Sequence, residues 1–294
     1  MIPAFAYPST FAMVRAWAGA NRISVAEARK RFAQYAILSA IAGSRFLGSA
    51  LVFKGGNALD FIWQPNRSTT DLDFSFDMTL VRSDTLDTAV FAGAFPPTLA
   101  VVGSQLGATF AVHRVRKQPP QANADFVTYT VIVGYALPDE TALRARMALG
   151  RASVNTIPVE ISINEPVCAE QSVPLTATTT LRVSTLEDIV AEKLRALLQQ
   201  PIRDRARKQD LLDIAVILEA DQPLDAARIA SFLQQKAAAR NVSVSRTAFH
   251  NPEIAVRAQR DYDTLAVTTR IRFIPFAPAL TRVLQFIDTL PLPP

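Results

Sequence analysis

The stretch LVFKGGNALDFIWQPNRSTTDLDFSFD, residues 51–77, constrains the fold more than any other part of the chain. Its first apolar residues, 51–53, predict a short strand that ends at the pair Gly55–Gly56. The segment DLDFSF, residues 71–76, alternates between polar and apolar residues and predicts a second strand. On that strand Asp71 and Asp73 share one face, roughly 7 Å apart at Cα, and the apolar residues face a core.

Two carboxylates held on one face repel each other unless a cation lies between them, and their oxygens are ligands that suit Mg²⁺. A glycine pair lets the backbone approach a ligand closely and exposes its N–H groups. Residues 57–63 predict a turn or two of helix, whose positive end adds to this anion site. Either motif alone is ordinary, as a turn or as the solvated face of an edge strand. Together they predict that a nucleoside triphosphate lies between the glycine turn and a metal on the aspartates.

The remaining pattern predicts an α/β (α+β) protein with a mixed β-sheet and a mainly helical C-terminal part. We expect a core with N-terminal helices in residues 1–180, a helical domain in residues 181–294, and an active site in the cleft between them. Further predicted strands are 109–115, 126–133 and 154–163. Predicted helices are 25–42, 84–106 with a break at Pro96–Pro97, one that follows a capping box starting at Ser184, 208–219, 224–239 and 279–289.

Composition narrows the class of protein. Hydrophobic residues make up 49% of the 294, so the chain can bury a core. A single cysteine, Cys168, excludes an intrachain disulfide and a cysteine-based zinc site, and His113 and His250 are too few for a histidine-ligated metal. The net charge of +5 permits a polyanionic partner without requiring one. No apolar stretch approaches a membrane span, and the N-terminus lacks a basic leader, so we expect a cytoplasmic protein with no membrane partner.

The segments FKGGNAL and NRSTTDLDFSF resemble the AbiEii family, the nucleotidyltransferase toxins of type IV abortive-infection toxin–antitoxin systems, which include the MenT toxins. The order of a glycine pair and then Asp-x-Asp on the next strand is similar to the wider polymerase-β-like nucleotidyltransferase superfamily. Arg67 matches the family pattern, while Asn57 and Thr69 stand where the family has threonine and serine.

Three later segments, LEDIVAEKLRALL, RARKQDLLDIAVI and IPVEISINE, also resemble the family. They place the following residues at family positions: Lys193, Asp210, Asp213 and Glu160. Gln209 departs from the family's arginine, a contact for which Arg207 or Lys208 could substitute. The resemblance covers about residues 20–220 and, more loosely, the helical tail.

The resemblance implies transfer of NMP from an NTP to an acceptor hydroxyl, that of the 3′ end of tRNA, with one or two Mg²⁺ ions and a cognate antitoxin as partner. Metal ligands would be Asp71, Asp73 and Glu160, and Glu160 could also help to deprotonate the hydroxyl. Catalytic residues would be these three with Lys193 and Asp210. The nucleotide would be bound by Lys54, Gly55, Gly56, Asn57, Arg67, Thr69 and Lys193.

Several of these residues have plainer interpretations. Glu160 fits equally well as an outward residue on a strand, and Lys193 as a lysine that reaches solvent along an apolar helix. Asp210 and Asp213 could orient Lys193 or Arg67, or pair with surface cations. A basic run is either a phosphate track for RNA or a solvated face: Arg203, Arg205, Arg207 and Lys208. The rival functions are a nucleotidyltransferase acting on a protein or small molecule, and a nucleotide-binding module without catalysis.

Overall fold

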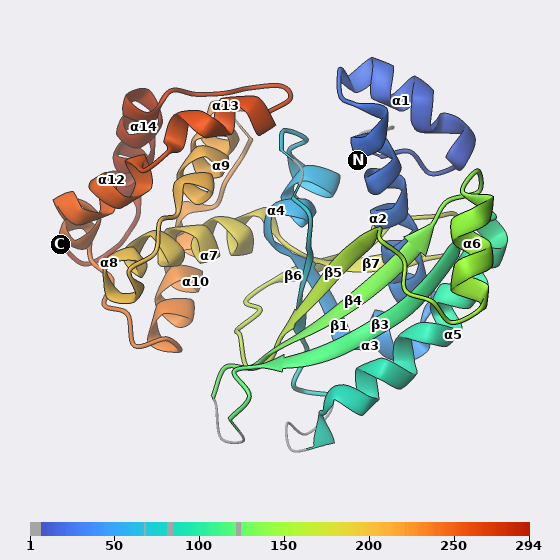
Figure 1. Cartoon of the computed structure of the whole chain (residues 1–294). Coiled ribbons are helices and arrows are strands. Elements are labelled where there is room, and N and C mark those ends of the chain that lie inside the picture. The colour runs from blue at the N-terminus through green and yellow to red at the C-terminus, as the bar shows by residue number, and fades with distance from the viewer. Residues whose placement is uncertain (1–6, 68, 81–84, 122–124, 221) are drawn as a thin grey trace. The chain divides into compact units, whose positions relative to one another are not determined.

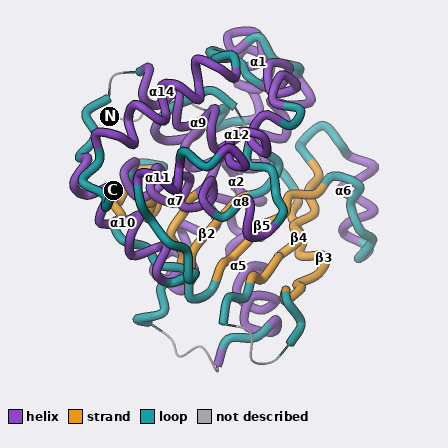
Figure 2. Tube along the Cα trace, turned by 90° about the vertical axis from the view of Figure 1, so that its left-hand side faces the viewer, coloured by secondary structure: helices purple, strands orange, loops and turns teal. Residues whose placement is uncertain are grey.

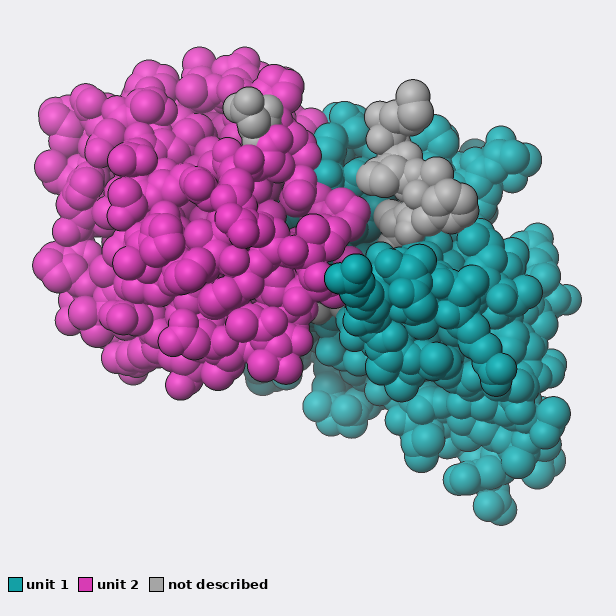
Figure 3. All heavy atoms as spheres, turned by 90° about the horizontal axis from the view of Figure 1, so that it is seen from above, with its two compact units in different colours: residues 1–63, 69–165, 170–183 teal, residues 64–68, 166–169, 184–294 magenta. Residues whose placement is uncertain are grey.

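The computed structural model describes residues 7–67, 69–80, 85–121, 125–220 and 222–294 (Figure 1). The chain forms two compact units, coloured separately in Figure 3. Unit 1 consists of residues 1–63, 69–165 and 170–183, and unit 2 of residues 64–68, 166–169 and 184–294. The segment between the glycine turn and the aspartate strand therefore contributes to both units. The predicted division into domains at residue 180 stays a prediction.

A seven-stranded mixed sheet forms the centre of unit 1, in the order β3-β4-β5-β2-β1-β7-β6. β2 lies antiparallel to β1 and parallel to β5, and β1 lies parallel to β7. The strand bounds are Leu51–Lys54 (β1), Leu72–Phe76 (β2), Thr109–Gln118 (β3), Thr128–Ala136 (β4), Thr156–Ser162 (β5), Glu170–Pro174 (β6) and Thr180–Ser184 (β7). The mixed α/β class predicted from the sequence is confirmed.

The last two strands were not predicted. In β6 only Val173 is buried, so the segment shows no alternation of polar and apolar residues. β7 does bury Leu181 and Val183, but it is five residues long and ends where the next helix is about to start. β7 is as long as β2, and its alternating burial was overlooked because the capping box that overlaps its last residue was assigned to the next helix.

The helices of unit 1 pack against this sheet and each other, and Figure 1 shows α5 lying along β3 and β4. α2 begins at the predicted cap, where the Ser24 hydroxyl accepts a hydrogen bond from the Glu27 amide at 3.1 Å, and it is buried over most of its length. The helix bounds are Val14–Asn21 (α1), Val25–Gly43 (α2), Arg45–Ala50 (α3), Gly55–Ala58 (α4), Thr88–Leu106 (α5) and Thr141–Ala148 (α6). A π-helix, Leu59–Trp63, follows α4 directly.

α5 corrects two predictions. It runs without a break through Pro96 and Pro97, because both prolines lie on the exposed side, where water can solvate the carbonyl groups that lose their donors. The first predicted residue of this helix lies outside the described residues. α5 is also long and apolar enough, by length and composition, to cross a membrane, contrary to the prediction that no such stretch exists. Phe91, Phe95 and Leu99 nevertheless bury one side of it in the core of unit 1. A cytoplasmic location stays a prediction.

Helices and loops make up most of unit 2, as the tube in Figure 2 shows for the segments around α7, α9 and α14. α7 packs against α9 and α10, and α9 against α14. The helix bounds are Leu186–Leu198 (α7), Gln200–Arg203 (α8), Lys208–Glu219 (α9), Ala226–Ala238 (α10), Arg246–Phe249 (α11), Pro252–Gln259 (α12), Leu265–Thr268 (α13) and Phe276–Thr289 (α14).

Several boundaries in unit 2 differ from prediction by one to three residues, and α10 is shorter than the predicted 224–239 at both ends. The cap of α7 is Thr185, whose hydroxyl accepts from the Asp188 amide at 3.3 Å, so the capping box starts one residue later than predicted. α14 starts at Phe276, three residues before the predicted start. Pro278 lies in its first turn, where a missing N–H costs no helical hydrogen bond.

Candidate active site

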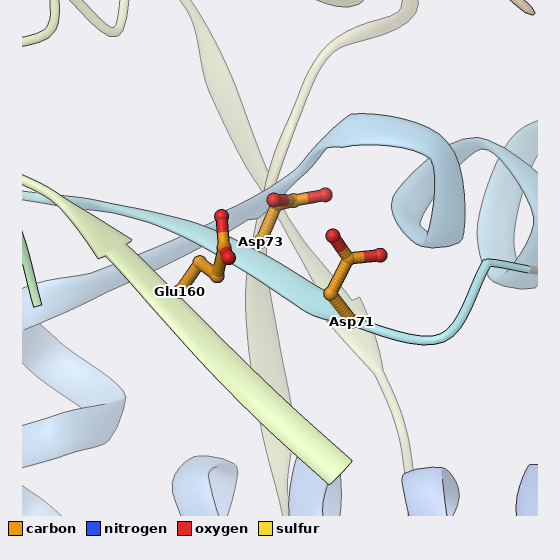
Figure 4. A group of neighbouring side chains, drawn as sticks. All are labelled: Asp71, Asp73 and Glu160. Atoms are coloured by element: carbon orange, nitrogen blue, oxygen red, sulfur yellow. The ribbon is translucent and has the colours of Figure 1, made fainter. Parts of the chain in front are cut away.

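Three carboxylates converge in unit 1. One oxygen each of Asp71, Asp73 and Glu160 lies within 4.8 Å of the others. Figure 4 shows the three side chains rising from the same face of the sheet. Asp73 on β2 pairs in register with Glu160 on β5, so two of the acids are neighbours across adjacent parallel strands. Asp71 was predicted inside the strand, but β2 starts at Leu72, and Asp71 lies one residue before it.

The electrostatics of this site favour a cation. All three side chains are partly buried. Burial raises the pKa of the Glu160 carboxyl, the nearby Asp71 raises it further, and Lys54 acts in the opposite direction. Carboxylate oxygens are hard donors, and a cluster whose members disfavour each other's ionisation is stabilised by a divalent ion. The residues therefore fit Mg²⁺.

The glycine turn lies directly against this cluster. Gly55 has φ +73°, a conformation that residues with a side chain rarely adopt. A Cβ placed on Gly55 would lie 2.4 Å from Oδ2 of Asp73 and 2.9 Å from its Cβ. The sequence prediction that the turn and the aspartates are neighbours agrees with this geometry. α4 starts at Gly55 rather than at residue 57 and continues directly into the π-helix Leu59–Trp63, so the predicted helical turns are present and begin at the glycine turn itself.

Asn57 was predicted to contact the nucleotide, but its side chain is buried against the backbone of residues 69–71. Its side chain is 0% exposed and turns toward backbone instead of toward open space. The amide nitrogen donates to the carbonyls of Thr69, at 3.1 Å, and Asp71. The Thr69 hydroxyl donates to the Asp71 carbonyl at 3.3 Å. Asn57 is thus in no position to contact a phosphate directly, because its polar atoms are occupied within the protein.

Lys54 forms an ion pair with Glu165, a residue that the sequence analysis did not single out. Both side chains are largely buried. The two residues are 111 positions apart, and no local signal marks Glu165 as the partner. The sequence interpretation of Lys54 as a nucleotide contact did not anticipate this pairing.

A second charged cluster lies in unit 2. The Lys193 ammonium donates to Oδ1 of Asp210 at 2.9 Å and to Oδ2 of Asp213 at 2.8 Å, and the Arg67 guanidinium donates to the same Asp213 oxygen at 3.1 Å. Lys193 is 6% exposed, so it does not reach solvent along the helix as the plainer interpretation had it. Asp210 and Asp213 do orient Lys193, as one of the two interpretations predicted.

Both central groups of this cluster are held in their charged forms. Burial acts to lower the pKa of Lys193, but the charges of Asp210 and Asp213 outweigh it and raise the pKa. Burial likewise acts to raise the pKa of Asp213, and Lys193 and Arg67 outweigh it and lower the pKa. The cluster is therefore a buried ion-pair network.

The basic run is only partly free for a partner. Arg203 and Arg205 are exposed. Lys208 donates to the Asp261 carbonyl and to the Thr264 hydroxyl, each at 3.0 Å, and so ties the start of α9 to the segment that follows α12. Nη1 of Arg207 lies 4.0 Å from Oδ2 of Asp210. The run thus combines a structural lysine with exposed arginines.

Comparison with known proteins identifies the family. The model of the family described as "Nucleotidyl transferase AbiEii toxin, Type IV TA system" matches residues 36–278. The chain belongs to the AbiEii family. The resemblance stated from the sequence is confirmed, and this AbiEii protein is by its family a nucleotidyltransferase toxin of a type IV toxin–antitoxin system, which implies an antitoxin partner.

Solved structures agree with this AbiEii fold. MenT4, a nucleotidyltransferase toxin from Mycobacterium tuberculosis H37Rv, matches with a TM-score of 0.55 at 19% identity, over 95% of this chain and 89% of that one. JHP933 from Helicobacter pylori matches with a TM-score of 0.48 at 16% identity, over 87% of each chain. A search of curated proteins gave no match. The likeness to MenT4 supports the nucleotidyltransferase fold.

Proposed function

We propose that this protein transfers NMP from an NTP to an acceptor hydroxyl and releases pyrophosphate. The observation that carries the proposal is the convergence of Asp71, Asp73 and Glu160 against the turn at Gly55. These carboxylates would hold one or two Mg²⁺ ions. When bound, Mg²⁺ would neutralise phosphate charge and stabilise the attacking and leaving oxygens of the displacement.

Side chains and backbone groups of the protein would accept the proton of the acceptor hydroxyl and orient the nucleotide. In the transfer a bond forms between the acceptor oxygen and the α-phosphorus, while the bond from the α-phosphorus to pyrophosphate breaks. Glu160 offers a carboxylate beside the other two acids and is suited to accept the hydroxyl proton. Gly55 and Gly56 would offer backbone N–H groups to the phosphates. Asn57, being buried, would act through the backbone that it holds.

The remaining nucleotide contacts would come from cations and a hydroxyl. Lys193 and Arg67 would contact phosphate oxygens, and Asp210 and Asp213 keep Lys193 charged and fixed in position. Thr69, whose hydroxyl donates to the Asp71 carbonyl, would act through the backbone that carries Asp71. Lys54 pairs with Glu165, so it would influence the nucleotide site through its charge and not by direct contact. The same charge opposes the rise in the pKa of Glu160.

We propose the 3′ end of tRNA as the acceptor, on the resemblance to the toxin family. The exposed Arg203 and Arg205 support a polyanionic partner, because such side chains bind phosphates without reading sequence. A cognate antitoxin would restrain the activity, as the type IV family implies. Other acceptors, a protein side chain or a small molecule, are outcomes of the test below.

The test incubates the purified protein with each NTP, labelled at the α-phosphate, in the presence of MgCl₂ and either tRNA or cell protein. We expect label in tRNA, and its loss in the variant Asp73→Ala with an unchanged circular dichroism spectrum. Label in protein alone would replace the proposed acceptor. NTP binding with no transfer to any acceptor would instead favour a binding module.

A further inference from the structure

A buried network in unit 1 reaches the backbone that carries Asp71. Arg31 on α2 is 1% exposed and forms an ion pair with Asp60, which is also 1% exposed. Its guanidinium carbon lies 3.4 Å from the ring centroid of Phe61. A buried cation held by a carboxylate and an aromatic face is fixed in orientation, because any other arrangement leaves its charge unpaired.

Arg31 determines how two neighbouring amide side chains point. Its Nη1 donates to Oδ1 of Asn57 at 2.8 Å and to Oε1 of Gln34 at 3.4 Å. Gln34 is 1% exposed and Asn57 is 0% exposed, so neither amide can exchange these partners for water. Since each amide oxygen faces the guanidinium, each amide nitrogen faces the opposite way.

Both amide nitrogens face the same short segment of backbone. Gln34 donates to the carbonyl of Thr69 at 2.9 Å and to that of Thr70 at 3.1 Å. Asn57 donates to the carbonyls of Thr69 and Asp71, and its oxygen accepts from the Thr69 amide at 3.3 Å. Residues 69–71 precede β2, so no ladder of sheet hydrogen bonds fixes them. The two amides take over that role.

We propose that Gln34 and Asn57, oriented by Arg31, are positioning residues that set the backbone at residues 69–71 and thereby place the Asp71 carboxylate among the metal ligands. The inference rests on the proposed function, since it takes Asp71 as a ligand. It explains why a fully buried asparagine follows the glycine pair: only an amide offers both an acceptor for Arg31 and donors for two carbonyls.

The test uses two variants of the full chain that keep the size of the side chain. Asn57→Asp replaces the donor nitrogen by an oxygen, and Gln34→Met removes both polar atoms. Two readouts are measured: Mn²⁺ affinity by electron paramagnetic resonance, and hydrogen exchange of peptides covering residues 69–76 without metal. Loss of such outer-shell partners weakens metal binding about 10- to 100-fold. We therefore expect Mn²⁺ affinity to fall about tenfold or more and exchange to accelerate in this segment.

Matched controls separate positioning from general loss of stability. Asn66→Asp alters another buried amide, one that donates to the Arg272 carbonyl at 3.0 Å in unit 2. Ser39→Ala removes a buried hydroxyl from the same helix as Gln34. Both controls should keep Mn²⁺ affinity within about twofold and leave exchange at 69–76 unchanged. Asp71→Asn provides the reference for a lost ligand.

Two results would overturn the inference in distinguishable ways. If Asn57→Asp and Gln34→Met bind Mn²⁺ like the unchanged protein while Asp71→Asn does not, the amides position nothing, and the proposed function survives. If the unchanged protein binds no Mn²⁺, the metal site fails, and the inference fails with it. If Gln34→Met does not fold, Asn57→Asp alone decides between these results.

Discussion

Substitution of Gly55 by alanine should disable the site by two separable effects. The φ of +73° is unfavourable for alanine by about 1–2 kcal/mol. In addition, the new Cβ would lie 2.4 Å from Oδ2 of Asp73, whereas an ordinary contact needs at least 3.4 Å. The carboxylate must therefore retreat by about 1 Å, and a displacement of this size costs on the order of 100-fold in rate. We expect Gly55→Ala to lower kcat about 100-fold in the NMP-transfer assay.

Gly150 provides a matched control for the backbone effect. It has nearly the same φ, +75°, but a Cβ there would meet no atom within 4 Å. Gly150→Ala should thus lose about 1–2 kcal/mol of unfolding free energy in urea and keep its transfer rate. The reasoning is refuted if Gly55→Ala loses stability as Gly150→Ala does but transfers NMP at the unchanged rate.

Three further predictions concern charge. Asp213→Asn leaves the buried Lys193 with one carboxylate and should cost about 3–5 kcal/mol of unfolding free energy in urea, because half of a buried pair is removed. Asp263→Asn, at an exposed carboxylate, should leave the urea midpoint unchanged, and equal effects of the two variants would contradict this. Hydrogen bonding to Arg272 lowers the pKa of Glu219 to about 2, so its stabilising contribution is present above the unfolded pKa near 4.5 and is lost as pH falls toward 2. The thermal midpoints of the unchanged protein and Glu219→Gln should therefore differ at pH 7 and converge by pH 2; a constant difference would refute the pairing. Removing Mg²⁺ with EDTA should abolish NMP transfer and restoring it should recover the rate, whereas transfer in EDTA would contradict a metal-dependent site.

Local sequence was sufficient where a pattern is repeated along one element. The apolar spacing of residues 208–219 predicted α9 with its observed ends, and the alternation in DLDFSF predicted β2 to within one residue. Strands that follow one another in the chain usually pair, so the turn at Gly55 could be expected beside Asp73 although residues 55–71 separate the two strands. These features depend on neighbours in the chain, which the sequence states directly.

Contacts between distant residues could not be predicted in the same way. The pairing of Lys54 with Glu165 joins strand ends that are 111 residues apart, and the sequence alone does not give their register. Asn57 was assigned to the nucleotide because it stands where the family has threonine. Its burial depends on Arg31, which lies on a helix 26 residues earlier. The continuous course of α5 through two prolines depends on which side of that helix faces solvent.

The most direct test of the central claim is a crystal structure of the protein soaked with MnCl₂ and a non-hydrolysable NTP, with an anomalous difference map calculated at the manganese edge. The account predicts an anomalous peak in contact with carboxylate oxygens of Asp71, Asp73 and Glu160, and nucleotide density beside Gly55. A bound nucleotide with its manganese away from these three carboxylates would contradict it.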